Sequence, residues 1–481
     1  MESEPGSLAK LLESILNSFI DLIGCDAGSI FALRPVAEGE PVLAFEAMIT
    51  RSIKLRRVPD HLKNLRFKVD DTTLVGRTAT HRKSHRISYT QEEGKTSPQV
   101  DRILNYSTQS ILSAPLITPR GDLVGVVQLL NKVTNKESGE IGNFTDRDER
   151  LFMIIAGQAA LAMENSMLLE AQEKLMEGFV NACVTAVEAR DPVTSGHSTR
   201  VASFTVSLAE AVNRTDSGLL KSTRFSPTQI REIRYAAMLH DIGKISVKEQ
   251  VLNKEKKLLP WELEIIRMRL KLMRAELRLK EQLNGARDKK LMEMIEGAWK
   301  IIANANEPTI LPAEAGAILH ELHAVQFSSV DGQTLAALTE RERIKLSILK
   351  GSLTADERHE IEQHVTHSYG ILKMVPWSRG LEFVPEIAYK HHEKIDGSGY
   401  PRGIQGGDIP IQARMLTICD IFDALSADDR PYKRSVPLET ALDILAAEVR
   451  EEKLDPDLFE IFLKARIFEQ AERYRPTKKA A

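Results

Sequence analysis

Cysteine is scarce in this chain of 481 residues, and the few cysteines are far apart. Cys25, Cys183 and Cys419 form no CxxC pair, so neither a disulfide framework nor a cysteine zinc site is predicted. Long apolar runs are lacking too, since segments such as MLTICDIF fall far short of the roughly 20 residues that a helix needs to cross a bilayer. The polar start, MESEPGSLAK, lacks the basic and apolar regions of a secretory signal. We therefore expect a cytoplasmic protein without a membrane segment.

The chain also has little net charge, with 65 Lys and Arg residues against 68 Asp and Glu residues, a balance of −3. Such a balance gives no overall attraction for nucleic acid or for an anionic membrane. An anionic ligand must then be held by a local cluster or by metal ions. The 42% hydrophobic and 28% charged content is typical of globular proteins, and the length predicts two or three domains.

The first 150 residues read as an α/β domain. The segment LAKLLESILNSFIDLIG has helical periodicity. Strand-like runs follow at 28–33, 42–48, 110–118 and 123–132. The turn sequence PRGD at 119–122 predicts that the last two runs form a hairpin.

A long helix is predicted after this domain, because no proline interrupts the pattern between Asp148 and Glu188. The apolar residues that recur at intervals of seven are Ile154, Leu161, Leu168 and Leu175. The companion heptad position is polar, with Gln158, Asn165 and Gln172. We favour a two-stranded signalling helix that joins the halves of a homodimer. The alternative is one long helix packed on its own domain.

Histidine and aspartate gather in short motifs of the second half, which is otherwise mostly helical. The motifs are SGHSTRV with His197, LHDIGKI with His240 and Asp241, IEQHVTHSYGIL with His364 and His367, KHHEKIDGSGYPRG with His391 and His392, and ICDIFDALSADDRPYK with Asp420 and Asp423. Imidazole and carboxylate together suit Fe, Mn or Zn better than Mg or Ca. Two such ions about 3.5–4 Å apart can clamp a phosphodiester. Each motif alone is equally typical of a solvated pair of histidines or a structural polar contact. Only the full set, in this order, indicates a metal centre.

This ordered set resembles the HD-GYP family, a branch of the HD phosphohydrolases that degrades cyclic dinucleotides. HDIGK at 240–244 and HHEKIDGSGYP at 391–401 carry the resemblance, which covers residues 177–254 and 350–445. It implies an all-α fold, a non-haem centre of two divalent ions, iron or else manganese, and hydrolysis of cyclic di-GMP to the linear dinucleotide or GMP.

The resemblance also implies roles for particular residues. The implied metal ligands are His197, His240, Asp241 and Asp420 for one ion, and the bridging Asp241 with His364, His391 and His392 for the other. The implied catalytic residues are Asp241 and Lys244. The implied substrate contacts are Lys244, Arg430, Lys433 and the turn formed by Gly399, Tyr400 and Pro401.

Two features depart from the family pattern. Val193 stands where some members have a glutamate ligand for a third metal, so two metals are expected. Glu188 can reach the centre only if the helix breaks at RDPVTSG. Residues 255–349 are inserted between LNK and KGSLT, and this helical insertion can cap the site, mediate dimerisation or form a peripheral bundle. His320, His323 and His367 are further histidines that the implied ligand set does not require.

The first domain resembles a GAF domain, a small-ligand sensor with an antiparallel sheet. Asn131-Lys132, Phe144 and Asp148-Glu149 are similar to a motif of cyclic-nucleotide-binding GAF domains. A Lys132–Asp148 ion pair would give this motif a structural role, so a cyclic nucleotide ligand and an empty GAF fold used for dimerisation both stay open. The basic residues Arg77, His81, Arg82 and Lys83 either line the pocket or form a solvated face.

The sequence thus predicts a multidomain chain. Its parts are a GAF sensor at 1–150, a linker helix at 151–188, an HD-GYP domain at 189–254 and 350–481, and the helical insertion at 255–349. The favoured function is a GAF-regulated, metal-dependent phosphodiesterase of cyclic di-GMP. The alternatives are a catalytically silent cyclic di-GMP receptor, a hydrolase of cyclic GMP-AMP, and a phosphohydrolase of monomeric nucleotides.

Overall fold

The fold was analysed in a computed structural model of the chain, which describes residues 7–36, 39–52, 65–88, 106–135, 137–191, 196–284, 288–328, 334–427 and 436–474. The chain divides into two compact units, Met1–Glu177 and Gly178–Ala481.

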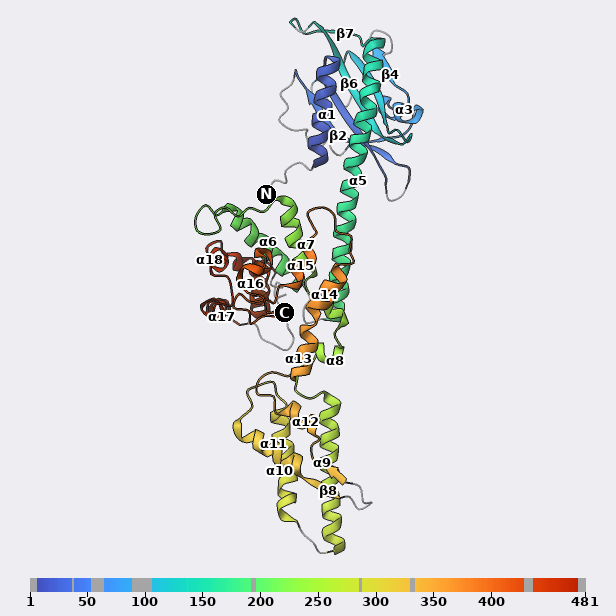
Figure 1. The fold of residues 1–481 in the computed structure, drawn as a ribbon. Coiled ribbons are helices and arrows are strands. Elements are labelled where there is room, and N and C mark those ends of the chain that lie inside the picture. The colour runs from blue at the N-terminus through green and yellow to red at the C-terminus, as the bar shows by residue number, and fades with distance from the viewer. Residues whose placement is uncertain are drawn as a thin grey trace, which may run out of the picture. The chain divides into compact units, whose positions relative to one another are not determined.

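The first unit is built on an antiparallel sheet (Figure 1). Its strands are β1 (Cys25–Arg34), β2 (Val42–Thr50), β3 (Arg66–Lys68), β4 (His85–Ser88), β5 (Ser110–Ile117), β6 (Leu123–Asn135) and β7 (Glu140–Gly142). Their order is β3-β2-β1-β6-β5-β4, and β7 pairs with β6. The predicted hairpin is confirmed, because β5 and β6 pair antiparallel across the 119–122 turn. The short strands β3, β4 and β7 were not predicted.

Helices cover both faces of this sheet. The helices are α1 (Ser7–Ile23), α3 (Leu74–His81) and the first part of α5 (Asp146–Arg190). One hydrophobic cluster joins α1 and α5 to the sheet, and Phe19 meets Phe152 edge to face within it. A second cluster lies under α3 and includes the edge-to-face pair of Phe31 and Phe45. The α/β fold of a GAF-like sheet is therefore as predicted.

The Asn131-Lys132 motif has a structural role, as its chemistry predicted. The Lys132 Nζ lies 2.8 Å from the Asp148 carboxylate and also donates to the Ile23 carbonyl. It thereby ties β6 to the end of α1 and the start of α5. Asn131 adopts a left-handed φ of 60°, and its amide nitrogen donates to the Tyr106 hydroxyl at 3.0 Å. The motif thus stabilises the junction of the sheet with its two helices.

The predicted long helix is present as α5, which runs without interruption over 45 residues and ends at Arg190, the first residue of the RDPVTSG segment. By length and composition alone the helix is apolar enough to cross a membrane, since its most apolar window has a mean hydropathy of 1.4. Phe152, Ala156 and Met163, however, belong to the core of the first unit. The heptad residues Ile154 and Leu175 are 71% and 75% exposed, so this stripe faces away from that core.

The second unit is helical. Its elements outside segment 255–349 are the end of α5, α6 (His197–Arg214), α7 (Pro227–Leu239), η2 (Ile242–Ser246), α8 (Glu249–Leu252), α13 (Ala355–Glu362), α14 (His364–Leu372), α15 (Val384–Tyr389), η3 (Gly406–Asp408), α16 (Ile411–Ser426), α17 (Leu438–Arg450), α18 (Pro456–Lys464) and η4 (Ile467–Tyr474). Edge-to-face contacts of Phe422 with Phe204 and Phe462 join α16 to α6 and α18. The predicted all-α fold of this region is confirmed.

Segment 255–349 has a hydrophobic core of its own. It consists of α9 (Pro260–Asn284), α10 (Lys289–Ala305), α11 (Ala313–Ala324), β8 (Gln326–Ser328), β9 (Thr334–Ala336) and α12 (Glu340–Leu346). The sequence predicted the helices but not the small hairpin of β8 and β9. Largely buried ion pairs lie at its base, where Lys254 meets Glu357 at 2.6 Å and Lys345 meets Glu262 at 2.7 Å.

Candidate metal centre

The HDIGK motif lies where α7 ends. A capping box of Ser226 and Gln229 begins this helix, and His240 forms its carboxyl-terminal cap. The chain then tightens into η2, which passes against the start of α14. A Cβ on Gly243 would lie 1.9 Å from the His364 carbonyl oxygen, so only glycine permits this approach. The glycine therefore brings Asp241 and His364 together.

Five separate elements contribute to one cluster of side chains. His197 and His364 are the first residues of α6 and α14. His391 and His392 follow α15, and Asp420 lies within α16. Three groups within this cluster have ligand atoms close enough together to hold an ion. They are His197 with His240 and Asp241, His240 with His391 and Asp420, and His364 with His391 and His392.

Three buried imidazoles present an unpaired nitrogen to this cluster. The Nε2 atoms of His240, His364 and His391 are buried and have no hydrogen-bond partner in the described part of the chain. In each ring the other nitrogen, Nδ1, donates to the carbonyl three residues earlier, at 2.7, 2.7 and 2.6 Å. This bond fixes the tautomer that leaves Nε2 as a lone-pair donor, which is the form that binds metals.

The two carboxylates lie between the imidazoles. Asp241 directs Oδ1 toward the His364 Nε2 at 3.2 Å and Oδ2 toward the His240 Nε2 at 3.4 Å. Asp420 Oδ1 lies 3.2 Å from the His197 Nε2 and 3.8 Å from the His240 Nε2. Because its two oxygens face different histidines, Asp241 has the disposition of a bridging ligand.

Several groups of the cluster are held in the protonation states that metals require. Burial, helped by neighbouring imidazoles, keeps the pKa of His391 well below its usual value, and it lowers the pKa of His392 to about 3. Burial alone would raise the pKa of Asp241, but the Lys244 ammonium and nearby imidazoles hold it well below the usual range. Neutral histidines and ionised carboxylates are the ligand forms.

His197 has its own supporting pair, Asp423 and Arg200. Its Nδ1 lies 2.7 Å from the Asp423 carboxylate, which also accepts from Arg200 Nε at 2.7 Å. Burial opposes protonation of His197, but hydrogen bonds to Asp420 and Asp423 outweigh it and raise its pKa to about 9. The sequence singled out Asp423 without giving it a role, and Arg200 was missed. Their spacing from His197 and Asp420 by one helical turn was the available signal.

Lys244 lies beside the same carboxylates. Its Nζ is 2.7 Å from Asp241 Oδ2 and 3.5 Å from Asp191 Oδ2. Burial disfavours the ammonium form, but the two carboxylates raise the pKa of Lys244 above its usual value. The residue is therefore a fixed cation at the edge of the cluster.

The GSGYP turn packs on the histidine pair. The Tyr400 ring lies 4.7 Å from the His392 ring, and the Tyr400 N–H donates to the His392 carbonyl at 3.2 Å. A Cβ on Gly399 would lie 2.5 Å from that carbonyl oxygen, so the turn requires glycine there. The buried Glu393 carboxylate accepts from the backbone N–H of Arg402 at 2.8 Å. Pro401 follows within this same turn.

Other predicted residues lie apart from the cluster or outside the described residues. Arg430, Lys433 and Val193 lie outside them. His367 and His320 are exposed, and His323 contacts the Leu338 carbonyl and Glu340. The Glu188 carboxylate accepts from the Gly196 N–H at 2.9 Å and so caps α6.

The basic residues predicted for the GAF pocket have contacts within the first unit. His81 pairs with Asp71 at 2.8 Å, and the Arg82 guanidinium donates to the Gly121 carbonyl at 3.0 Å. Arg77 lies in α3, and Lys83 follows the residue that caps its end. These contacts give the basic residues a role in the fold and leave the choice of GAF ligand open.

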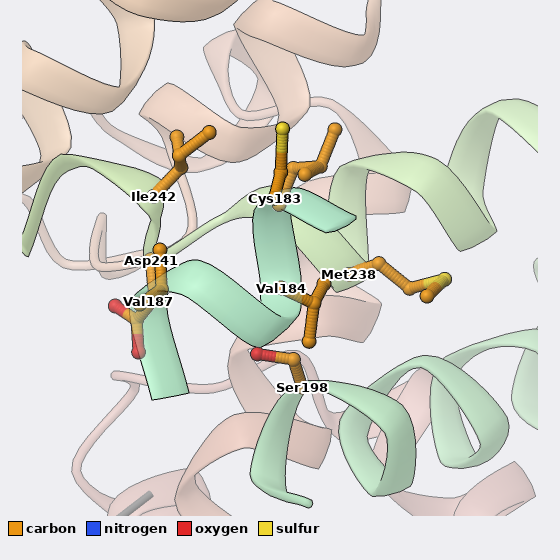
Figure 2. A pocket seen from close by; sticks show the side chains of 8 residues that line it. Cys183, Val184, Val187, Ser198, Met238, Asp241 and Ile242 are labelled. Atoms are coloured by element: carbon orange, nitrogen blue, oxygen red, sulfur yellow. The ribbon is translucent and has the colours of Figure 1, made fainter. Parts of the chain in front are cut away.

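The end of α5 packs behind the adjacent residues His240 and Asp241, the HD pair. Figure 2 shows Cys183, Val184 and Val187 of this helix beside Met238 and Asp241. The crevice between them has no room for a water molecule. A displacement of this helix end would therefore press directly on the segment that carries Asp241.

Family models match both halves of the chain. A GAF domain family model matches residues 7–163, and two HD domain models match residues 194–314 and 341–458. The chain therefore joins a GAF domain to an HD domain.

Two relatives indicate the kind of HD domain. One is a 3′3′-cGAMP-specific phosphodiesterase 3 of Vibrio cholerae, 26% identical over 76% of this chain and 54% of the relative. Another is a cyclic di-GMP phosphodiesterase of Thermotoga maritima, 38% identical over 25% of this chain and 32% of the relative. The chain thus spans about half or less of each relative. Among solved structures, a GAF domain/HD domain protein of Geobacter sulfurreducens overlaps 34% of this chain and 95% of its own, at 12% identity and a TM-score of 0.26.

Proposed function

We propose that this chain, in which a GAF domain precedes an HD domain of the HD-GYP type, is a metal-dependent phosphodiesterase that hydrolyses cyclic di-GMP to linear pGpG or GMP. The observation that carries the proposal is the set of three buried, unpaired Nε2 atoms that converge with two carboxylates. An unpaired buried polar atom costs stability unless a partner binds it. Three such atoms around ionised aspartates have the chemistry of a metal centre.

The residues present fit two ions. His197, His240, Asp241 and Asp420 would hold one, and Asp241, His364, His391 and His392 would hold the other. Iron or manganese is proposed on the family resemblance, and the mixture of imidazole with carboxylate suits either ion. When bound, the two ions would supply Lewis-acid stabilisation of phosphate charge and activation of water.

Residues at the edge of the cluster would bind and orient the substrate. Lys244, whose ammonium lies beside Asp241, would meet a phosphate oxygen of the incoming dinucleotide. Gly399, Tyr400 and Pro401 would form a wall, since the Tyr400 ring is already fixed against His392. Arg430 and Lys433 are proposed as further phosphate contacts on the resemblance alone.

Regulation by the GAF domain is part of the proposal. The exposed heptad stripe of α5 would pair with the same helix of a second copy and form a homodimer. A cyclic nucleotide is the proposed GAF ligand. Its binding would shift the packing of α5, and Val184 and Val187 would transmit that shift to the HD pair.

Product analysis tests the activity. The protein, reconstituted with iron under reducing conditions or with manganese, is incubated with cyclic di-GMP and the products are separated by chromatography. We expect pGpG or GMP from the native chain and none from Asp241→Ala. The matched control is Asp443→Ala, which changes an exposed aspartate of α17 and should leave turnover intact. Metal-loaded protein that binds the substrate without turnover would contradict catalysis and favour the receptor function.

A second substrate follows from one relative, whose name includes 3′3′-cGAMP. The same assay with 3′3′-cGAMP measures the ratio of kcat/KM for the two substrates. If the ratio favours 3′3′-cGAMP, that compound replaces cyclic di-GMP as the proposed substrate. It would leave the metal centre unchanged.

A further inference from the structure

A stripe of apolar side chains runs along the outer face of α9. The stripe consists of Trp261, Ile265, Met268, Leu272, Ala275 and Leu279. All six residues are exposed, and Trp261, Met268 and Leu272 have exposed fractions of 50%, 62% and 48%. Single exposed apolar residues are ordinary, but a continuous row of them marks a binding surface.

The fold of segment 255–349 does not need this stripe. The opposite face of α9, with Ile266, Leu270, Met273 and Leu277, is buried in the core of the segment. The helix is therefore apolar on two faces, one for its own core and one directed outward. Its 25 residues make it about 37 Å long.

The spacing of the stripe indicates another helix as its partner. The intervals between successive residues are four, three, four, three and four, which is a heptad repeat with d at Trp261 and a at Ile265. The repeat holds over almost three heptads. Such a pattern suits a second helix with the same pattern, because a and d residues of one helix insert between those of the other.

The charges beside the stripe favour a second copy of α9 in parallel. In that orientation each g residue meets the e residue five positions later in the other helix. Glu264 would face Arg269 of the other copy and Lys271 would face Glu276, so both pairs are opposite in sign and each occurs twice. In the centred antiparallel orientation Lys271 and Arg269 would each meet the same residue of the other copy, and only Glu264 with Arg278 would be opposite in sign. Arg269 also bonds Glu342 of α12 at 2.9 Å, so Glu264 of the other copy would be a second carboxylate for its guanidinium.

We propose that segment 255–349 is a dimerisation device, in which α9 pairs in parallel with α9 of a second copy of this chain. A membrane surface is the less favoured occupant, because such helices carry a mainly basic polar face and the borders of this stripe carry both signs. The inference is independent of the proposed catalytic activity and of the proposed pairing of α5.

Position-specific cross-linking tests the proposal in the full chain. In a Cys183→Ser background, Leu272→Cys is oxidised at low protein concentration and compared with Arg274→Cys, an exposed neighbour outside the stripe. We expect about tenfold more disulfide dimer from Leu272→Cys, because a residues of a parallel pair lie opposite each other. No dimer from Leu272→Cys, or equal yields from both variants, would overturn the proposal.

Orientation is tested by mixing two variants, Ile265→Cys and Ala275→Cys, that carry tags of different size. A parallel pair gives little mixed dimer, whereas an antiparallel pair would give mainly mixed dimer and overturn the stated geometry. Sedimentation with anionic vesicles tests the alternative occupant. Vesicle binding that Met268→Glu with Leu272→Glu abolishes, without cross-linking at Leu272→Cys, would assign the stripe to a membrane surface.

Discussion

At the scale of single residues, the candidate centre depends on residues outside the proposed ligand set. The Asp423 carboxylate lies 2.7 Å from the His197 Nδ1, and the Arg200 guanidinium donates to the same carboxylate. Gly243 permits the contact of η2 with α14. These residues set where the ligand atoms lie, so their substitution should alter metal binding before it alters the chemistry.

Asp423→Asn should weaken metal binding by about 10–100-fold, the usual effect of losing a carboxylate that orients a ligating histidine. The affinity is measured by metal titration of the full chain, with Asp443→Asn on the exposed face of α17 as the control. Excess metal should restore part of the turnover. An unchanged metal affinity would show that Asp423 does not orient His197.

Gly243→Ala should displace η2 from α14, since the new Cβ would lie 1.9 Å from the His364 carbonyl oxygen. We expect a loss of about 1–3 kcal/mol in the free energy of unfolding, as for other overpacked sites, and a lower metal content. Urea unfolding and metal analysis measure the two effects. Gly370→Ala in α14 is the matched control, because nothing lies within 4 Å of its Cβ, and it should be neutral or slightly stabilising.

At the scale of elements, ion pairs at helix ends join the parts of each unit. The Lys132–Asp148 pair connects β6 to α5, and its side chains are only 17% and 14% exposed. The Arg51–Asp21 pair, by contrast, is 48% and 70% exposed. A pair shielded from water should contribute far more to stability than an exposed one.

Lys132→Met should lower the stability of the first unit by about 2 kcal/mol near neutral pH, the scale of a charge-assisted hydrogen bond. Burial raises the pKa of Asp148, but hydrogen bonds from Lys132 and Thr145 lower it overall. The carboxylate therefore contributes its stability above about pH 4, the unfolded pKa, and loses it as the pH falls through the folded pKa. The difference between native chain and variant should shrink in acid.

Hydrogen exchange of peptides from β5 and β6 in the full chain measures this difference. Arg51→Met is the control and should change protection by less than about 1 kcal/mol. A difference between native chain and Lys132→Met that grows in acid would contradict the assigned role of Asp148.

At the scale of the whole molecule, metal binding should stabilise one unit alone. All ligands implied for the two ions lie in the second unit, between His197 and Asp420. Metal at 100 times its dissociation constant should add about 2.7 kcal/mol to the stability of that unit. Chelation should raise exchange in peptides of α6 and α7 and leave β5 and β6 unchanged. Equal changes in both units would contradict the assignment of the centre.

The proposed pairing of α5 is also a property of the whole molecule. Leu161→Asp with Leu168→Asp places charges in the exposed heptad stripe and should raise the dimer dissociation constant by about 100-fold, equivalent to roughly 2.8 kcal/mol. Sedimentation measures the change, and Lys174→Asp, an exposed residue beside the stripe, is the control. An unchanged constant would remove α5 from the dimer contact.

The sequence by itself determined the features that depend on local order. The heptads of α5, the β5–β6 hairpin and the histidine motifs are periodic or contiguous patterns, and a chain carries these in its linear order. The Lys132–Asp148 pair was also predicted, because both residues lie near the junction of a strand with a helix. The roles of the ligand set remain predictions, although the structure brings all seven residues into one cluster.

Only the tertiary structure decided how distant segments meet. His197 and Asp423 are 226 residues apart, and although the one-turn spacing of Asp423 from Asp420 places it near the centre, only the packing of α16 on α6 pairs it with His197. The same holds for Gly243, whose need for a missing Cβ appears only when α14 lies against η2. The outer face of α9 also appeared only once its inner face was buried, because the sequence shows apolar residues on both sides and the core selects one of them. Long-range packing, which one linear pattern does not record, made these decisions.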